Sequence, residues 1–135
     1  MLKIVSKILN FLKSFINKAK INNLGKNSKP YCLIFKRDGN SKINIGDNCL
    51  INGRLVTETS ESIINISNNV FIGGNTIIDC LSEIQILDNV LISYECILSD
   101  HDSHSIDSSK RINDLSRFQS DKMIWKEVDN KKITI

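Results

Sequence analysis

The sequence predicts an all-β domain, a parallel β-helix of hexapeptide repeats, preceded by an amphipathic α-helix. The first observation behind this prediction is that three segments, 43–51, 64–72 and 84–92, can be laid over one another. Each has an apolar-x-Ile triplet, an Asp/Asn-Asn pair and a second apolar-x-Ile triplet. The second observation is that aliphatic residues recur every six positions within these segments and beyond them.

A period of six predicts short strands separated by tight corners. Side chains at positions i−2 and i share one face of a strand, so each triplet directs two residues inward. Asn and Asp tolerate turn geometry, whereas the flanking β-branched residues favour strands. Three such strands form a triangular coil of about 18 residues. An antiparallel sandwich would not require a constant period of six.

The composition indicates one globular domain and gives no sign of nucleic-acid binding. A chain of 135 residues with 41% hydrophobic residues fits one globular domain. The formal net charge of +3 is too small to indicate nucleic acid as the partner. No Cys-x-x-Cys pair and no secretory signal occur, so the four cysteines are expected to be reduced core residues of a cytoplasmic protein.

Residues 1–20 have apolar side chains at the spacing of an amphipathic helix. Four lysines interrupt the apolar run up to residue 18, so the helix is not expected to span a membrane. Its apolar stripe could pack on the domain or on a partner subunit. Alternatively, the helix could lie on an anionic membrane surface, giving peripheral contact at the inner face. Residues 21–42 are expected to form a turn-rich linker and the first strands, and residues 43–104 the coils.

The units Ile-Gly-Asp-Asn-Cys-Leu-Ile and Ile-Leu-Asp-Asn-Val-Leu-Ile resemble those of the hexapeptide-repeat acyltransferases. The resemblance implies a left-handed β-helix, usually a homotrimer, that transfers an acetyl group from acetyl-CoA. The general preference for right-handed crossovers would predict the opposite hand.

The two histidines, His101 and His104, lie in an Asp-rich segment after the third repeat. Asp102-Ser-His-Ser-Ile106, followed by Arg111-Ile-Asn, resembles the catalytic segment of sugar and polysaccharide O-acetyltransferases. The resemblance implies His104 as the catalytic general base, with His101 as the alternative. A neutral imidazole can take a proton from a sugar hydroxyl at neutral pH.

Further candidate residues surround this histidine segment. Asp102 and Asp100 are the local carboxylates expected to orient the base. Asn75, one coil earlier, matches loosely an Asn that contacts substrate in some sugar acetyltransferases. With Asp100 and Arg111 it is expected to bind substrate. The alternative is a polar surface loop with two solvated histidines. The gamma-class carbonic anhydrases share the β-helix and use three histidines for zinc; this chain has two, so no such metal site is expected.

Residues 105–132 lack the six-residue frame and are expected to form a protruding loop. This loop either packs on a coil or neighbouring subunit, or covers a sugar acceptor. Residues 133–135 match the start of a further coil, so the sequence resembles a truncated acyltransferase. The expected function is acetyl-CoA-dependent O-acetylation of a surface polysaccharide or lipopolysaccharide precursor. The alternative is an inactive remnant that serves only as a binding or scaffold module.

Overall fold

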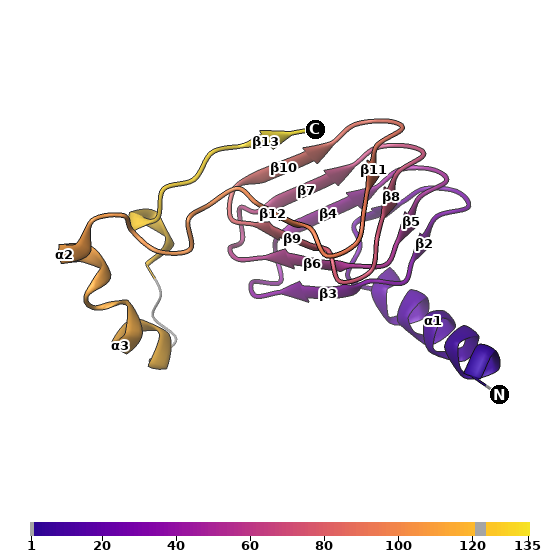
Figure 1. Ribbon diagram of the computed structural model, residues 1–135, viewed down its shortest axis with the longest axis horizontal. Helices are drawn as coiled ribbons and strands as arrows, with labels where there is room; N and C mark the ends of the chain where they lie inside the picture. The colour runs from indigo at the N-terminus through magenta and orange to yellow at the C-terminus, as the bar shows by residue number, and fades with distance from the viewer. Residues whose placement is uncertain (1, 121–123) are drawn as a thin grey trace.

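The computed structural model describes residues 2–120 and 124–135, which form a parallel β-solenoid of about four turns preceded by a helix (Figure 1). Three parallel sheets build its sides. The first contains β1 (Asn23–Leu24), β4 (Lys42–Ile45), β7 (Ile63–Ile66), β10 (Glu83–Ile86) and β13 (Ile133–Thr134). The second contains β2 (Lys29–Pro30), β5 (Leu50–Ile51), β8 (Phe71–Ile72) and β11 (Leu91–Ile92). The third contains β3 (Leu33–Lys36), β6 (Arg54–Thr57), β9 (Ile77–Cys80) and β12 (Ile97–Ser99). The prediction of a parallel β-helix is confirmed, and its handedness stays a prediction.

Stacked aliphatic side chains fill the interior. In the first sheet Ile43 pairs with Ile64, which pairs with Ile84 in the next coil. In the second sheet Ile51 pairs with Ile72 in the same way, and all five side chains are fully buried. Each buried Ile contributes about 1.5–3 kcal/mol of hydrophobic stabilisation. The residues of the six-residue frame are therefore the ones that hold the coils together.

The Asp/Asn-Asn pairs stack at one corner of the solenoid, and each position of the pair has its own task. The side chain of the first residue caps the coil before it: Asn68 Oδ1 accepts from the backbone N–H of Asp47 at 2.8 Å. The second residue takes a positive φ, which is 57° at both Asn48 and Asn69. Asn adopts this left-handed conformation more readily than most residues, which explains why it recurs there.

The segment expected to be a linker is instead part of the first coil. Strand β1 pairs with β4, and β2 pairs with β5, at an offset of 21 residues. Asn27 has the same positive φ of 57° as the corner asparagines of later coils. Residues 21–42 thus contain the first strands, as expected, but the part expected to be a turn-rich linker belongs to the coil as well. The corner residues of a coil are the same Gly and Asn that mark a flexible connection.

Helix α1 (Leu2–Lys18) lies beside the first coil, where it contacts β2 and β3 (Figure 1). Its polar side faces the coil. The side chain of Asn17 is buried and donates to the backbone carbonyls of Pro30 at 2.8 Å and Cys32 at 2.9 Å. The expectation that the apolar stripe packs on the domain is therefore wrong for this chain, because carbonyl groups of the coil bind the polar face.

The chain leaves the solenoid after β12 and returns to it as β13. Between them lie α2 (Ser108–Arg111), α3 (Asp114–Gln119) and the 3₁₀ helix η1 (Trp125–Glu127). These short helices lie outside the stack of coils (Figure 1). Strand β13 then pairs with β10, and Ile133 takes the position that follows Ile84 in the first sheet. We call residues 100–132 the excursion.

The cysteines are thiols and form no disulfide in the described part of the chain. Cys32, Cys49 and Cys80 are buried in the core. Burial raises the pKa of the Cys32 thiol to about 12, and burial with the nearby Asp100 carboxylate raises that of Cys80 to about 12. Both thiols therefore stay protonated and unreactive at neutral pH.

Candidate active site

Asp100 fixes the point where the chain leaves the fourth coil. Its carboxylate is buried and accepts from the backbone N–H groups of Leu81 at 2.7 Å and of Ser82 and Glu83 at 2.8 Å each. Both oxygens are thus used to hold the corner of the preceding coil. In the described residues Asp100 forms no hydrogen bond to a histidine, contrary to the expectation that it orients the base. Its role in binding substrate stays a prediction.

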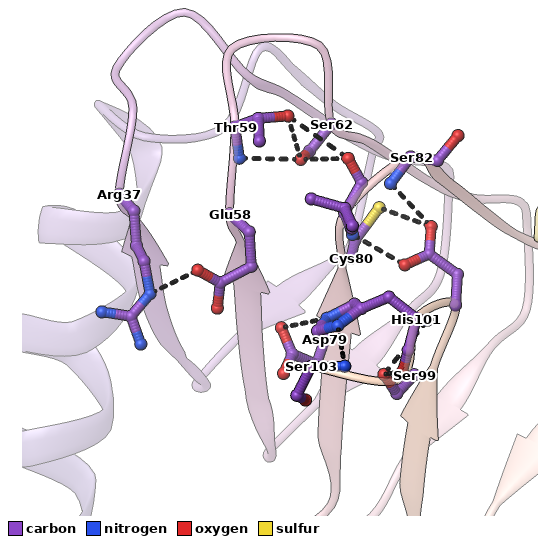
Figure 2. A network of polar contacts seen from close by, with 12 residues as sticks. Arg37, Glu58, Thr59, Ser62, Asp79, Cys80, Ser82, Ser99, His101 and Ser103 are labelled. Carbon is purple, nitrogen blue, oxygen red and sulfur yellow. Dashed lines mark hydrogen bonds and ion pairs between the residues drawn. The ribbon is translucent and has the colours of Figure 1, made fainter. Parts of the chain in front are cut away.

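A row of charged side chains follows the ends of the third-sheet strands in successive coils. Arg37 Nε lies 2.6 Å from Glu58 Oε2, and Asp79 Oδ1 lies 3.4 Å from His101 Nε2 (Figure 2). The side chain of His101 is only 1% exposed and that of Glu58 5% exposed. Arg37 and Glu58 directly follow the paired residues Lys36 and Thr57, so they stack in consecutive coils. Asp79 lies opposite Val56 and Ser99 and reaches His101 from the strand itself.

His101 is hydrogen-bonded at Nδ1 and faces a carboxylate with Nε2. Its Nδ1 accepts the backbone N–H of Ser103 at 3.0 Å, so in the neutral ring the proton lies on Nε2, facing Asp79. Burial disfavours the charged ring, but the carboxylates of Asp79, Asp100 and Glu58 outweigh it and raise the pKa of His101 above the ordinary 6.5. Burial also raises the pKa of Glu58, which Arg37 counteracts only in part. Nδ1 of His101 is therefore bonded to Ser103, whereas Nε2 faces Asp79 and makes no hydrogen bond in the described residues.

His104 has the geometry of a general base. Its Nδ1 lies 2.8 Å from Oδ2 of Asp114, whose side chain is only 7% exposed. A carboxylate at Nδ1 keeps the proton on that nitrogen and leaves the lone pair of Nε2 as the acceptor. The His104 side chain is 43% exposed, so the ring is open to a substrate.

The first residue of α3, Asp114, is held in place by contacts along the excursion. Arg117 Nη1 lies 3.5 Å from Asp114 Oδ1 and 2.8 Å from Glu127 Oε2. The ring of Phe118 packs edge-on against His104 with centroids 5.5 Å apart. The carboxylate and the imidazole are therefore positioned by neighbours on α3 and η1, and not by the coil itself.

Three cavities adjoin these histidines. One, of about 480 Å³, is lined by residues 99–102, which include Asp100, His101 and Asp102, and by residues 129–134. Phe118 lines the other two. The first of these two, of about 400 Å³, is lined by His104, Arg111, Asp114, Leu115 and Phe118. The second, of about 580 Å³, is lined by Arg37, Glu58, Asp79, His101, Ser103, Phe118 and Trp125. The Trp125 ring lies edge-on to His101 with centroids 5.6 Å apart. The second cavity combines carboxylates, an imidazole and aromatic rings, a mixture suited to hydroxyl groups and apolar faces of a small ligand.

The other expected site residues lie as follows. Arg111 lines the same cavity as His104. Asp102 is exposed and its backbone N–H donates to Asp129 O, and in the described residues its carboxylate forms no bond to a histidine. The carboxylate that pairs with His104 is therefore Asp114 in place of Asp102. Asn75 is an exposed corner residue with φ 61°, at the start of β9, whereas Asp79 and His101 meet near the other end of that strand.

Sequence reasoning missed Asp114, Glu58, Asp79 and Trp125. Asp114 directly follows the Arg-Ile-Asn segment that resembles the acetyltransferases. The same resemblance could therefore have drawn attention to its carboxylate. Glu58 and Asp79 do not occupy equivalent positions, because β6 and β9 pair at an offset of 23 residues and Asp79 lies opposite Val56. The repeat therefore gave no signal that these two carboxylates come together. Trp125 had no signal either.

No group of three or more metal-ligating side chains occurs in residues 2–120 and 124–135. Nor does any helix in those residues have the length and apolar character needed to cross a membrane. Comparison of the chain with protein-family models, with curated proteins and with solved structures gave no match.

Proposed function

We propose that this chain is an acetyl-CoA-dependent O-acetyltransferase with His104 as its general base. The proposed acceptor is a sugar hydroxyl of a surface polysaccharide or lipopolysaccharide precursor. One observation carries the proposal: His104 Nδ1 lies 2.8 Å from a buried carboxylate, that of Asp114, while the ring is partly exposed beside a cavity. The parallel β-helix, whose repeats resemble those of the hexapeptide acyltransferases, supports the same reaction class.

The chemistry assigns a task to each nitrogen of His104. Asp114 keeps a proton on Nδ1, so Nε2 accepts the proton of the sugar hydroxyl. Acetyl-CoA supplies the thioester carbonyl that the hydroxyl oxygen attacks. The new bond joins that oxygen to the carbonyl carbon, the carbon–sulfur bond breaks, and Nε2 returns the proton to the leaving thiolate. Asp114 stabilises the positive charge on the ring between the two proton transfers.

The two cavities lined by Phe118 offer contacts for different parts of the substrates. Glu58, Asp79 and His101 offer acceptors and a donor for sugar hydroxyls, and Trp125 offers an aromatic ring against which a sugar can pack. Arg111, in the cavity of His104, is a cation able to bind a phosphate group of either substrate. Phe118 lines both cavities, so an acceptor that extends from one to the other would pass this ring.

The proposal extends to assembly and location. Leu91, Tyr94 and Ile97 are exposed on the fourth coil, which favours contact between copies of the chain and supports a homotrimer. Unpaired buried cysteines favour a reducing compartment, the cytoplasm.

The test is acetyl transfer to a panel of sugars and oligosaccharides, with the acetylated product detected by mass spectrometry. The His104→Ala variant should lose activity by about 10²–10⁴-fold, the usual contribution of general-base assistance. Asp114→Asn should lose less, because the imidazole remains. His101→Gln should lose less than His104→Ala. Full activity of His104→Ala, or a larger loss for His101→Gln, would overturn the assignment of the base.

Calorimetry with acetyl-CoA tests the reaction class separately. Binding of acetyl-CoA by both the wild type and His104→Ala supports the proposal and shows that the variant is folded. Absence of binding by the wild type at millimolar concentration contradicts it and favours a β-helix that acts as a binding or scaffold module.

A further inference from the structure

Helix α1 presents its apolar face to the outside of the molecule. The residues of α1 that are buried or half-buried are polar: Asn10, Lys13, Ser14 and Asn17. Eight large apolar side chains on the same helix are between 48% and 71% exposed: Ile4, Val5, Ile8, Leu9, Phe11, Leu12, Phe15 and Ile16. A surface helix ordinarily buries its apolar stripe, so this orientation is the reverse of the usual one.

Specific hydrogen bonds fix that orientation. Asn17 Nδ2 binds two carbonyls of the first coil, and Lys20 Nζ donates to the carbonyl of Ile34 at 2.8 Å. These bonds satisfy carbonyl groups at the end of the solenoid and set the rotation of the helix about its own axis. The fold consequently holds the apolar face outward, so this face is already oriented for binding in the free protein.

The charges on α1 select the kind of partner. Residues 1–20 contain five lysines and no Asp or Glu. At 100° per residue, Lys7 and Lys18 lie at one border of the apolar face, next to Phe11 and Ile4. Lys29 lies beside Lys7 where the helix meets the first coil. A second copy of this helix would bring lysines together with no carboxylate to pair with them, whereas an anionic lipid surface matches both the charge and the apolar face.

We propose that α1 binds the surface of an anionic lipid bilayer, with its apolar face in the boundary between headgroups and acyl chains. The helix of 17 residues is about 25 Å long and would lie in the plane of the membrane. Phe11 and Phe15 would enter the boundary, and Lys7 and Lys18 would contact lipid phosphates. The β-helix would then be tethered at its first coil, with the excursion at the other side of the solenoid (Figure 1). This inference does not depend on the proposed enzymatic activity.

Co-sedimentation of the full chain with lipid vesicles tests the proposal. The wild type should bind phosphatidylcholine vesicles that contain phosphatidylglycerol, and bind pure phosphatidylcholine vesicles far more weakly. The double variant Phe11→Ser/Phe15→Ser should lower the partition coefficient by about tenfold or more, since two buried aromatic side chains are lost. The double variant Lys7→Glu/Lys18→Glu should lower it by about tenfold on anionic vesicles alone.

Matched variants control for exposure and charge. Ile106→Ser/Ile112→Ser changes two apolar side chains that are 70% and 78% exposed in the excursion, and it should bind like the wild type. Lys110→Glu/Lys131→Glu makes the same change of charge away from α1 and should have a smaller effect. An unchanged far-UV circular dichroism spectrum shows that each variant is folded.

Three outcomes would overturn the proposal. They are absence of wild-type binding to anionic vesicles, equal binding to neutral and anionic vesicles, and equal losses in the variants and their controls. If the wild type does not bind vesicles and Phe11→Ser/Phe15→Ser dissociates an oligomer in light scattering, the apolar face instead contacts a second copy of the chain.

Discussion

The stacked coils and the excursion are built in opposite ways. In the coils an inward side chain meets an equivalent one 20, 21 or 23 residues away, as Ile43, Ile64 and Ile84 do. In the excursion each contact occurs once, as in the pair of His104 with Asp114. Repetition makes the coils stable and predictable, and it also leaves them chemically uniform. The candidate general base His104 and its carboxylate partner Asp114 are found where the repetition stops.

The largest expected effect lies inside the coils. Ile72→Ala removes a fully buried side chain between Ile51 and Ile92 and should lower the free energy of unfolding by about 2–5 kcal/mol. Ile112→Ala changes a residue of the excursion that is 78% exposed and should alter it by about 0.5 kcal/mol or less. Urea unfolding followed by circular dichroism measures both. Equal losses would show that the excursion contributes to the core after all.

A smaller effect is expected where the two regions meet. Asp100→Asn replaces one carboxylate oxygen, which accepts backbone N–H groups, by an amide that donates. The free energy of unfolding should fall by about 1.5–3 kcal/mol, the range for hydrogen bonds to a charged group. Asp102→Asn is the matched control, because its side chain is exposed, and it should be close to neutral. If the control is as destabilised as Asp100→Asn, the backbone caps are not what Asp100 contributes.

The smallest expected effect concerns the row of charges beside the excursion. The pKa of Glu58 is raised above 4.5 and that of His101 above 6.5 in the folded chain. A raised pKa contributes stability below the ordinary value, and this contribution is lost as the pH rises through the folded value. Stability should therefore decline above pH 4.5 through Glu58 and above pH 6.5 through His101.

Two variants separate these contributions. In Glu58→Gln the first decline should be weaker, and in His101→Gln the second. The measurement is the urea midpoint at a series of pH values. Variant profiles that run parallel to that of the wild type would contradict this account.

The sequence predicted the stacked coils better than it predicted the excursion. The six-residue period gave the buried positions of the coils, because stacking makes period and burial the same property. Part of the first coil was mistaken for a linker although Gly25-Lys-Asn repeats Gly46-Asp-Asn at the same offset of 21. The helix was predicted, but its orientation was not. Periodicity shows which residues share a face and does not show which face is covered.

The site was predictable only in part. His104 and Arg111 were named from a resemblance, and they line one cavity. Asp114 could not be derived from the residues alone, because its pairing with His104 depends on how α2 and α3 fold back. The orienting role of Asp100 was misjudged because a carboxylate next to a histidine looks the same in sequence whether it faces that histidine or a backbone turn.

The two ends of the excursion are joined at its base, which has a consequence for how such proteins diversify. The backbone N–H of Lys131 donates to the backbone carbonyl of Asp100 at 2.8 Å, and His101 and Asn130 form an antiparallel β-bridge. The intervening segment thus starts and finishes at one anchored point, and closing a somewhat longer loop there costs little additional entropy. Evolution or engineering could exchange residues 103–128 for a segment of another length without disturbing the scaffold, and so alter which molecule is recognised.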